Sequence, residues 1–265
     1  MKDVYIYCNW KIYLDDEQSE SLLRGILSSL QALTLPDKSP NINLKLFPST
    51  SSLRSLSKII SNCDLPNKKL KLSMGCQNIH YEKAGAFTGE TSIMAIQGYC
   101  ESILVGHSER RNIFAEKNAD LNKKTALILE NKLEPVICIG EPENLLKNDS
   151  EGYLREQILS SVADIDISHQ VVFAYEPTGS IGTGVATSPV EVNLKSKLIK
   201  KILKQNIPHV DLSLIKILYG GSVNNENITD YLSASDVDGV LVGSSSVDLQ
   251  KFQMILDKII TLSST

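Results

Sequence analysis

The sequence predicts an α/β protein that folds as a single (β/α)8 barrel over residues 1–265. Eight short apolar segments recur along the chain, and segments of helical periodicity lie between them. No linker, low-complexity tract or shift in composition marks a second domain. Eight strand–helix units in a row favour a closed barrel, and an open doubly wound sheet is the alternative.

The predicted strands are short apolar runs, and several are apolar on both faces, as in a parallel sheet covered by helices. They are VYIYC (4–8), INLKLF (42–47), LKLSMG (70–75), SILV (102–105), PVICI (135–139), VVFAY (171–175), IKILY (215–219) and GVLV (239–242). In such a barrel, the loops that follow the strands form the active site.

The predicted helices carry apolar residues at spacings of three to four, which indicates one buried face. These stripes are Leu22, Leu23, Ile26, Leu27 and Leu30; Leu154, Ile158 and Val162; Leu194, Leu198 and Ile202; and Phe252, Ile255, Leu256, Ile259 and Ile260. Ser188 to Glu191 form a capping-box sequence with Pro189 at the first helical position, so a helix should begin there.

Composition excludes several classes of protein. The net charge of -4 provides no basic surface for nucleic acid or anionic lipid, so a small-molecule substrate is expected. The cysteines, Cys8, Cys63, Cys76, Cys100 and Cys138, are odd in number and lack a C-x-x-C spacing, which predicts free thiols in a reducing compartment. Without a signal peptide or a membrane-spanning run, the sequence predicts a cytoplasmic protein.

Four polar residues follow predicted strands and should therefore meet at one rim of the barrel. Asn9 and Lys11 leave the first strand on the same side, where an amide and an ammonium would orient a phosphorylated carbonyl compound. His107 lies at a helix N-terminus, which disfavours an imidazolium and favours a neutral hydrogen-bond donor. Glu176 follows the sixth strand and is the candidate base for carbon-acid chemistry.

Each of these residues also has an ordinary interpretation: a solvated lysine, a capping histidine or a glutamate in an exposed turn. Only their joint position above one barrel favours catalysis. The remaining histidines, His80, His169 and His209, lack a comparable context, and the histidines show no metal-ligand spacing.

Three glycine- and serine-rich segments follow the last three predicted strands. They are residues 179–184, Tyr219 to Ser222 and Gly243 to Ser246. Glycine allows backbone N–H groups to converge on an anion, so the three segments together predict a phosphate site. The dinucleotide fingerprint and the P-loop sequence are both missing, so no nucleotide cofactor is expected.

Together the motifs CNWK, QN with GAFTGE, VGHSERR, VICIGE, AYEP with GSIGTG, YGGSV and DGVLVG resemble the triosephosphate isomerase family in order and spacing. The resemblance implies that Glu176 is the base and neutral His107 the electrophile, as is described for that family. It also implies that Lys11 and Asn9 stabilise an enediolate. Backbone N–H groups of Gly182, Ser222, Gly243 and Ser244 would bind the substrate phosphate, with no cofactor and no metal.

The same resemblance implies further contacts. Glu109 corresponds to an ion-pair partner of the lysine, and Cys138 corresponds to a cysteine on the fifth strand. The GAFTGE segment around Thr88 resembles a loop that enters a neighbouring subunit, which implies a homodimer. Glu90 and Arg110 are then candidates for an ion pair between subunits.

The sequence departs from the family pattern at Gly179, where tryptophan is usual, at Val185, where lysine is usual, and at Ser244, where a second glycine is usual. Thr178 also replaces a valine. Loss of the tryptophan predicts looser closure over the site, and hence more elimination of the enediolate to methylglyoxal than a tryptophan-containing relative shows.

Three alternatives to a triose-phosphate isomerase remain at this point. The first is an isomerase of a four-carbon ketose phosphate that uses space opened at Gly179. The second is a non-catalytic homologue that binds a sugar phosphate, and the third is an unrelated phosphate-binding barrel. The presence of all four proton-handling residues, Asn9, Lys11, His107 and Glu176, favours an enzyme.

Overall fold

The computed structural model describes residues 2–36, 38–142, 145, 149–177 and 186–262. Its strands form one closed barrel in the order β1 to β8, every adjacent pair is parallel, and β8 pairs with β1. The strands are β1 (Val4–Asn9), β2 (Ile42–Phe47), β3 (Leu70–Cys76), β4 (Ser102–Val105), β5 (Glu134–Ile139), β6 (Val171–Tyr175), β7 (Ile215–Tyr219) and β8 (Gly239–Val242). The predicted (β/α)8 barrel is confirmed.

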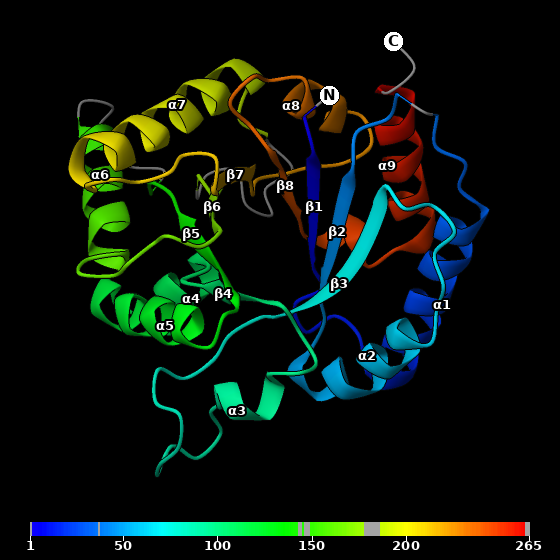
Figure 1. Ribbon diagram of the computed structural model, residues 1–265, viewed down its shortest axis with the longest axis horizontal. Helices are drawn as coiled ribbons and strands as arrows, with labels where there is room; N and C mark the ends of the chain where they lie inside the picture. Colours follow the sequence, from blue (N-terminus) through cyan, green and yellow to red (C-terminus); the bar gives the residue numbers. More distant parts are fainter. Residues whose placement is uncertain (1, 37, 143–144, 146–148, 178–185, 263–265) are drawn as a thin grey trace.

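Helices surround the strands, as Figure 1 shows. They are α1 (Asp16–Ala32), α2 (Leu53–Ser61), α3 (Ile93–Ile96), α4 (Ser108–Asn112), α5 (Asn118–Glu130), α6 (Ser150–Ser161), α7 (Pro189–Asn206), α8 (Ile228–Leu232) and α9 (Leu249–Leu262), with short 3-10 turns η1 (Thr50–Ser52) and η4 (Ser244–Ser246). The segment that leads to α3 projects beyond this ring (Figure 1). None of the described helices is both long and apolar enough to cross a membrane.

The apolar core has two parts because successive side chains of a strand point to opposite faces. One face of each strand packs against the surrounding helices, and the other fills the barrel interior. The interior cluster comprises Tyr5, Tyr7, Phe47, Leu104, Val136, Cys138, Val172, Ala174, Leu218 and Leu241. Gly75 is required there, because a Cβ atom on it would lie 2.1 Å from the ring of Phe47. This packed interior supports the rim of the barrel rigidly.

The predicted helix faces are confirmed in α1, α6 and α9, but the stripe assigned to α7 is wrong at its first residue. Leu194 is 60% exposed, whereas Val192, Ile199 and Ile202 are fully buried. Residues spaced by four drift around a helix that has 3.6 residues per turn, so a run from Leu194 reaches the core only at its end. The predicted helix start is correct: Ser188 is the N-cap, accepts a hydrogen bond from the amide of Glu191, and precedes Pro189.

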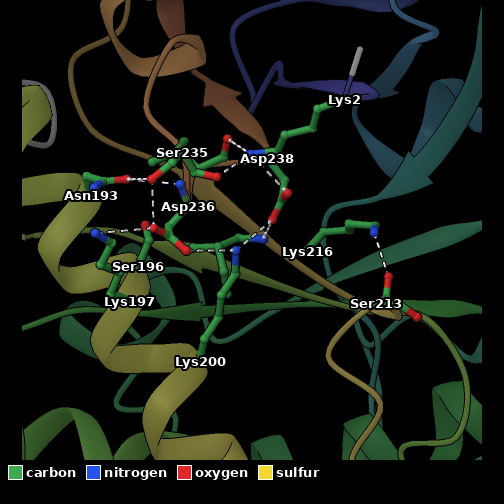
Figure 2. A network of polar contacts seen from close by, with 12 residues as sticks. Lys2, Asn193, Ser196, Lys197, Lys200, Ser213, Lys216, Ser235, Asp236 and Asp238 are labelled. Atoms are coloured by element: carbon green, nitrogen blue, oxygen red, sulfur yellow. Dashed lines mark hydrogen bonds and ion pairs between the residues drawn. The ribbon is translucent and has the colours of Figure 1, made fainter.

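Polar networks occupy the amino-terminal end of the barrel. In the network of Figure 2, Asp238 accepts a hydrogen bond from the amide of Ile217 at 2.8 Å and lies 3.2 Å from the ammonium of Lys2. Lys200 of α7 lies 3.5 Å from Asp236 and 3.9 Å from Asp238. The network therefore joins the chain start, β7, β8 and α7.

A second network fills the barrel interior at the same end. Glu134 accepts hydrogen bonds from the Tyr7 hydroxyl at 2.7 Å, the Lys45 ammonium at 2.8 Å and the Ser102 hydroxyl at 2.7 Å. The amide of Gln170 also donates to it. The charges at this end are thus paired inside the barrel.

The five cysteines are free thiols, and all except Cys63 are buried. This agrees with the prediction that no disulfide framework exists.

Candidate active site

A cavity of about 300 Å³ lies at the carboxyl ends of the strands. Seven of the eight predicted site residues line it: Asn9, Lys11, His107, Glu176, Ser222, Gly243 and Ser244. The eighth, Gly182, lies outside the described residues, as do Thr178, Gly179 and Val185. The remaining lining residues are Tyr13, Gly220, Gly221, Val223, Asn224, Leu241 and Ser245.

The end of β1 holds Lys11 in an unusual conformation. Its φ of 50° lies in the left-handed region, which is uncommon for a residue with a side chain. The amide of Lys11 donates to Oδ1 of buried Asn9 at 3.0 Å, and its carbonyl accepts from Gln77 at 2.7 Å. These hydrogen bonds stabilise the strained turn and direct both side chains to the cavity.

Lys11 also forms an ion pair with Glu109, which belongs to the first turn of α4. The side chain of Lys11 is 19% exposed, and that of Glu109 is 41% exposed. The pair thus keeps the lysine ammonium at the cavity wall, as the resemblance implied.

His107 is the N-cap of α4 and is buried at the cavity wall. Its Nδ1 accepts a hydrogen bond from the amide of Glu109 at 3.3 Å. Because a neutral imidazole has one accepting and one donating nitrogen, this bond assigns the proton of the neutral ring to Nε2. A donor is therefore available at Nε2.

Glu176 is almost fully buried, at 2% exposed. Its Oε2 accepts a hydrogen bond from the amide of Ser108 at 3.1 Å, and its Oε1 lies 3.4 Å from Nε2 of His107. Oε1 has no hydrogen-bond partner among the described residues. An unsatisfied buried carboxylate oxygen is costly, and such groups are characteristic of functional sites.

The backbone of three strands encloses Glu176. Its amide donates to the carbonyl of Ile139 at 2.7 Å. A Cβ atom on Gly140 would lie 1.9 Å from the Glu176 carbonyl oxygen, and one on Gly220 would lie 2.8 Å from its Cγ. Gly140 is therefore needed for the backbone of Glu176 to fit, and Gly220 for its side chain.

Cys138 lies beneath the carboxylate in the barrel interior. Burial raises the pKa of its thiol well above 9, and the charge of Glu176 raises the pKa further. The thiol is therefore protonated and adds no second negative charge next to the carboxylate.

The loops after β7 and β8 form the opposite wall. The side chain of Asn227 donates to the Ser222 carbonyl at 2.9 Å, and the Ser245 hydroxyl donates to the Val223 carbonyl at 3.1 Å. Ser244 begins η4, and its φ lies outside the left-handed region, so a side chain at this position causes no backbone strain. The departure from glycine is tolerated.

Sequence reasoning missed half of the lining residues. Gly220, Gly221 and Ser245 belong to the segments that it did identify, and Val223 and Asn224 directly follow one of them, so loop position was an available signal. Leu241 could have been found by alternation along β8, since it points into the barrel interior. Tyr13 has no comparable signal in the sequence.

The described part of the proposed subunit contact shows Arg110 engaged within its own chain. Its Nε lies 3.3 Å from Glu116, and its guanidinium lies over the ring of Phe114 at 4.9 Å. The ion pair between Glu90 and Arg110 of two subunits stays a prediction.

The arrangement brings a buried carboxylate, a neutral imidazole donor and a lysine ammonium around one small polar cavity. A carboxylate can accept a proton from carbon, while the other two groups stabilise negative charge on oxygen. Together, these three groups are able to move a proton at a carbon atom next to a carbonyl group.

Comparison with known proteins gives a consistent result. The model of the family described as triosephosphate isomerase matches residues 4–259. Proteins named triosephosphate isomerase are similar to the chain: 37% identical over 260 residues in Amoebophilus asiaticus, and 33% identical in Finegoldia magna and Dictyoglomus thermophilum. Each match covers 97% of this chain and 99% of the relative. The chain therefore belongs to the triosephosphate isomerase family, a family of aldose–ketose isomerases.

Proposed function

We propose that the protein interconverts dihydroxyacetone phosphate and D-glyceraldehyde 3-phosphate through an enediolate, in glycolysis and gluconeogenesis. The observation that carries the proposal is the position of the buried Glu176 carboxylate, whose unsatisfied oxygen lies 3.4 Å from His107 Nε2 at the edge of the cavity. The family membership supports the same reaction.

In this mechanism, Glu176 removes the proton from C1 of dihydroxyacetone phosphate and returns it at C2. His107 donates a hydrogen bond from Nε2 to the substrate oxygens, because its Nδ1 is occupied by the Glu109 amide. Lys11 and Asn9 stabilise the negative charge of the enediolate. Each role uses a group that lines the cavity.

The phosphate would be bound by backbone N–H groups of Ser222, Gly243 and Ser244, and by Gly182. The first three line the same cavity as Glu176. Their loops contain little side-chain bulk, so amides can approach an anion closely. These loops would hold the sugar phosphate by its phosphate group, so that its carbon atoms face the Glu176 carboxylate.

The hydrogen bond between Oε2 of Glu176 and the Ser108 amide holds the base before the reaction. Proton transfer requires the carboxylate to approach the substrate carbon, at about 3–3.5 Å. We therefore infer that substrate competes with the Ser108 amide for this side chain.

A coupled assay with glyceraldehyde 3-phosphate tests the proposal when Glu176→Asp is measured beside the native protein. The substitution retracts the carboxylate by one methylene, and a misplacement near 1 Å costs roughly 10²-fold in rate. Glu17→Asp, an exposed change in α1, is the control and should keep full activity. A native protein without isomerase activity, or a Glu176→Asp variant at full rate, would contradict the proposal.

We also propose that the protein is a cytoplasmic homodimer joined through the loop around Thr88. The segment before α3 projects from the ring of helices (Figure 1) and exposes Phe87 at 42%, and α3 exposes Met94 at 63%. The free cysteines favour a reducing compartment. Sedimentation should give twice the 29.2 kDa chain mass, and Phe87→Arg should shift it toward the monomer. A monomeric native protein would contradict the dimer.

A further inference from the structure

Two buried tyrosines hold the peptide groups of one residue near the cavity. The amide of Thr187 donates to the Tyr219 hydroxyl at 3.0 Å, and the Tyr231 hydroxyl donates to the Thr187 carbonyl at 2.6 Å. The two rings lie against each other, with centroids 4.3 Å apart. Both side chains are almost completely buried. Residues from β7 and α8 therefore fix the chain where it enters α7.

Thr187 connects the two hydroxyls. Burial raises the pKa of Tyr231, so its hydroxyl stays protonated and can donate to the Thr187 carbonyl. The amide of the same residue donates to the Tyr219 hydroxyl. Tyr231, Thr187 and Tyr219 thus form one hydrogen-bonded series, the tyrosine network.

The tyrosine network lies directly beneath the cavity wall. A Cβ atom on Gly221 would lie 2.1 Å from the hydroxyl oxygen of Tyr219, so the Gly221 backbone rests on that oxygen. Helix α8 supports the same loop a second time, since its N-cap Asn227 donates to the Ser222 carbonyl. Tyr231 lies one helical turn beyond Asn227. The loop from Gly220 to Asn224 is therefore held at two points from α8.

We propose that Tyr231, which does not line the cavity, is a positioning residue for the phosphate-binding loop from Gly220 to Asn224. Its hydroxyl holds Thr187, the Thr187 amide holds the Tyr219 hydroxyl, and the Gly221 backbone rests on that oxygen. Ring contact between the two tyrosines adds to this support. The inference rests on the proposed function, because it assumes that this loop binds the substrate phosphate. Phosphate affinity, rather than proton transfer, is the quantity that Tyr231 controls.

Tyr231→Phe tests the proposal, because it keeps the ring and its packing and removes only the hydroxyl. We expect the inhibition constant of inorganic phosphate and the KM for glyceraldehyde 3-phosphate to rise about two- to tenfold, the change that one neutral hydrogen bond produces. The value of kcat should change less than KM. Phosphate binding is also measurable by calorimetry, without the isomerase reaction.

Tyr7→Phe is the matched control. It removes a buried tyrosine hydroxyl that donates to Glu134 at the opposite end of the barrel. It should lower Tm as Tyr231→Phe does, yet leave phosphate affinity unchanged. A merely structural role for Tyr231 would make the two variants behave alike, with unchanged phosphate affinity in both, and would overturn the proposal.

A double variant tests the tyrosine network itself. Because Tyr231 acts on the loop through Thr187 and Tyr219, Tyr219→Phe combined with Tyr231→Phe should weaken phosphate binding no more than the stronger single change. Additive losses would overturn this network as the route of action. If the native protein binds phosphate but does not isomerise trioses, the proposed function fails while the role of Tyr231 in anion binding is still measured.

Discussion

Oε1 of Glu176 lies 3.4 Å from Nε2 of His107, although the two residues follow different strands and are 69 positions apart in the chain. The backbone amide of Ser108, next to the histidine, binds the other carboxylate oxygen at 3.1 Å. The start of α4 therefore holds one oxygen of the Glu176 carboxylate by a hydrogen bond, while the other oxygen has no hydrogen-bond partner among the described residues. This second oxygen is available to a ligand in the cavity.

The fit of this base against Gly220 predicts a strong effect of one added methyl group. In Gly220→Ala, the Cβ would lie 2.8 Å from Cγ of Glu176, so the carboxylate must move. We expect kcat to fall roughly 10²-fold, because a misplacement near 1 Å has that effect. Steady-state kinetics measure it.

Gly152→Ala is the control for this substitution. No heavy atom lies within 4 Å of a Cβ atom at Gly152 in α6, and alanine favours the helix. Its kcat should equal that of the native protein. An active Gly220→Ala variant would show that the position of Glu176 is not limiting.

The buried thiols predict a loss of stability at alkaline pH. Burial raises the pKa of Cys100 from 9 to about 12. The unfolded chain therefore releases this proton near pH 9 and the native protein does not. The contribution of the protonated Cys100 thiol to the free energy of unfolding is complete below pH 9. It is lost as pH rises toward 12, by roughly 1.4 kcal/mol per pH unit.

Urea denaturation between pH 9 and 11 measures this effect. The free energy of unfolding of the native protein should fall more steeply with pH than that of Cys100→Ala. The two slopes should differ by the effect of one titrating thiol, roughly 1.4 kcal/mol per pH unit. Parallel pH dependences in the two proteins would contradict the raised pKa.

The network around Glu134 predicts that the amino-terminal end of the barrel stabilises the fold. Lys45→Met removes the cation from a carboxylate whose side chain is only 12% exposed. We expect a loss of roughly 3 kcal/mol in the free energy of unfolding, as for other buried pairs broken on one side. KM should not change, because neither residue lines the cavity.

Lys71→Met is the matched control, since Lys71 is an exposed lysine at the same end of the barrel. Its unfolding free energy should change by no more than about 0.5 kcal/mol. Equal destabilisation by both variants would show that burial of the Lys45 pair is unimportant.

Much of the fold could be predicted because strand signals in this chain are strong. All eight strands occur where apolar runs predicted them, and β1, β3 and β5 are each one residue longer than predicted. The orientation of α7 was not predicted correctly at Leu194, because a spacing of four fits more than one face of a helix. Periodicity gives a helix, but tertiary packing selects its buried face.

The lining of the cavity was partly predictable from the sequence, but its contacts were not. Four polar residues follow predicted strands, which indicated that they meet at one rim of the barrel: Asn9, Lys11, His107 and Glu176. The hydrogen bond from the Ser108 amide and the two tyrosine hydrogen bonds to Thr187 involve backbone groups of residues distant in the chain. Sequence pattern carries no signal for such contacts, because any residue type supplies the same backbone atoms.

The central claim is that Glu176 removes a proton from the carbon of a bound sugar phosphate. The most direct measurement is deuterium incorporation into dihydroxyacetone phosphate in heavy water, followed by NMR, for the native protein and for Glu176→Gln. The native protein should exchange one C1 hydrogen with solvent, and Glu176→Gln, which is nearly isosteric and cannot accept the proton, should show almost none. Equal exchange by both proteins would contradict the account.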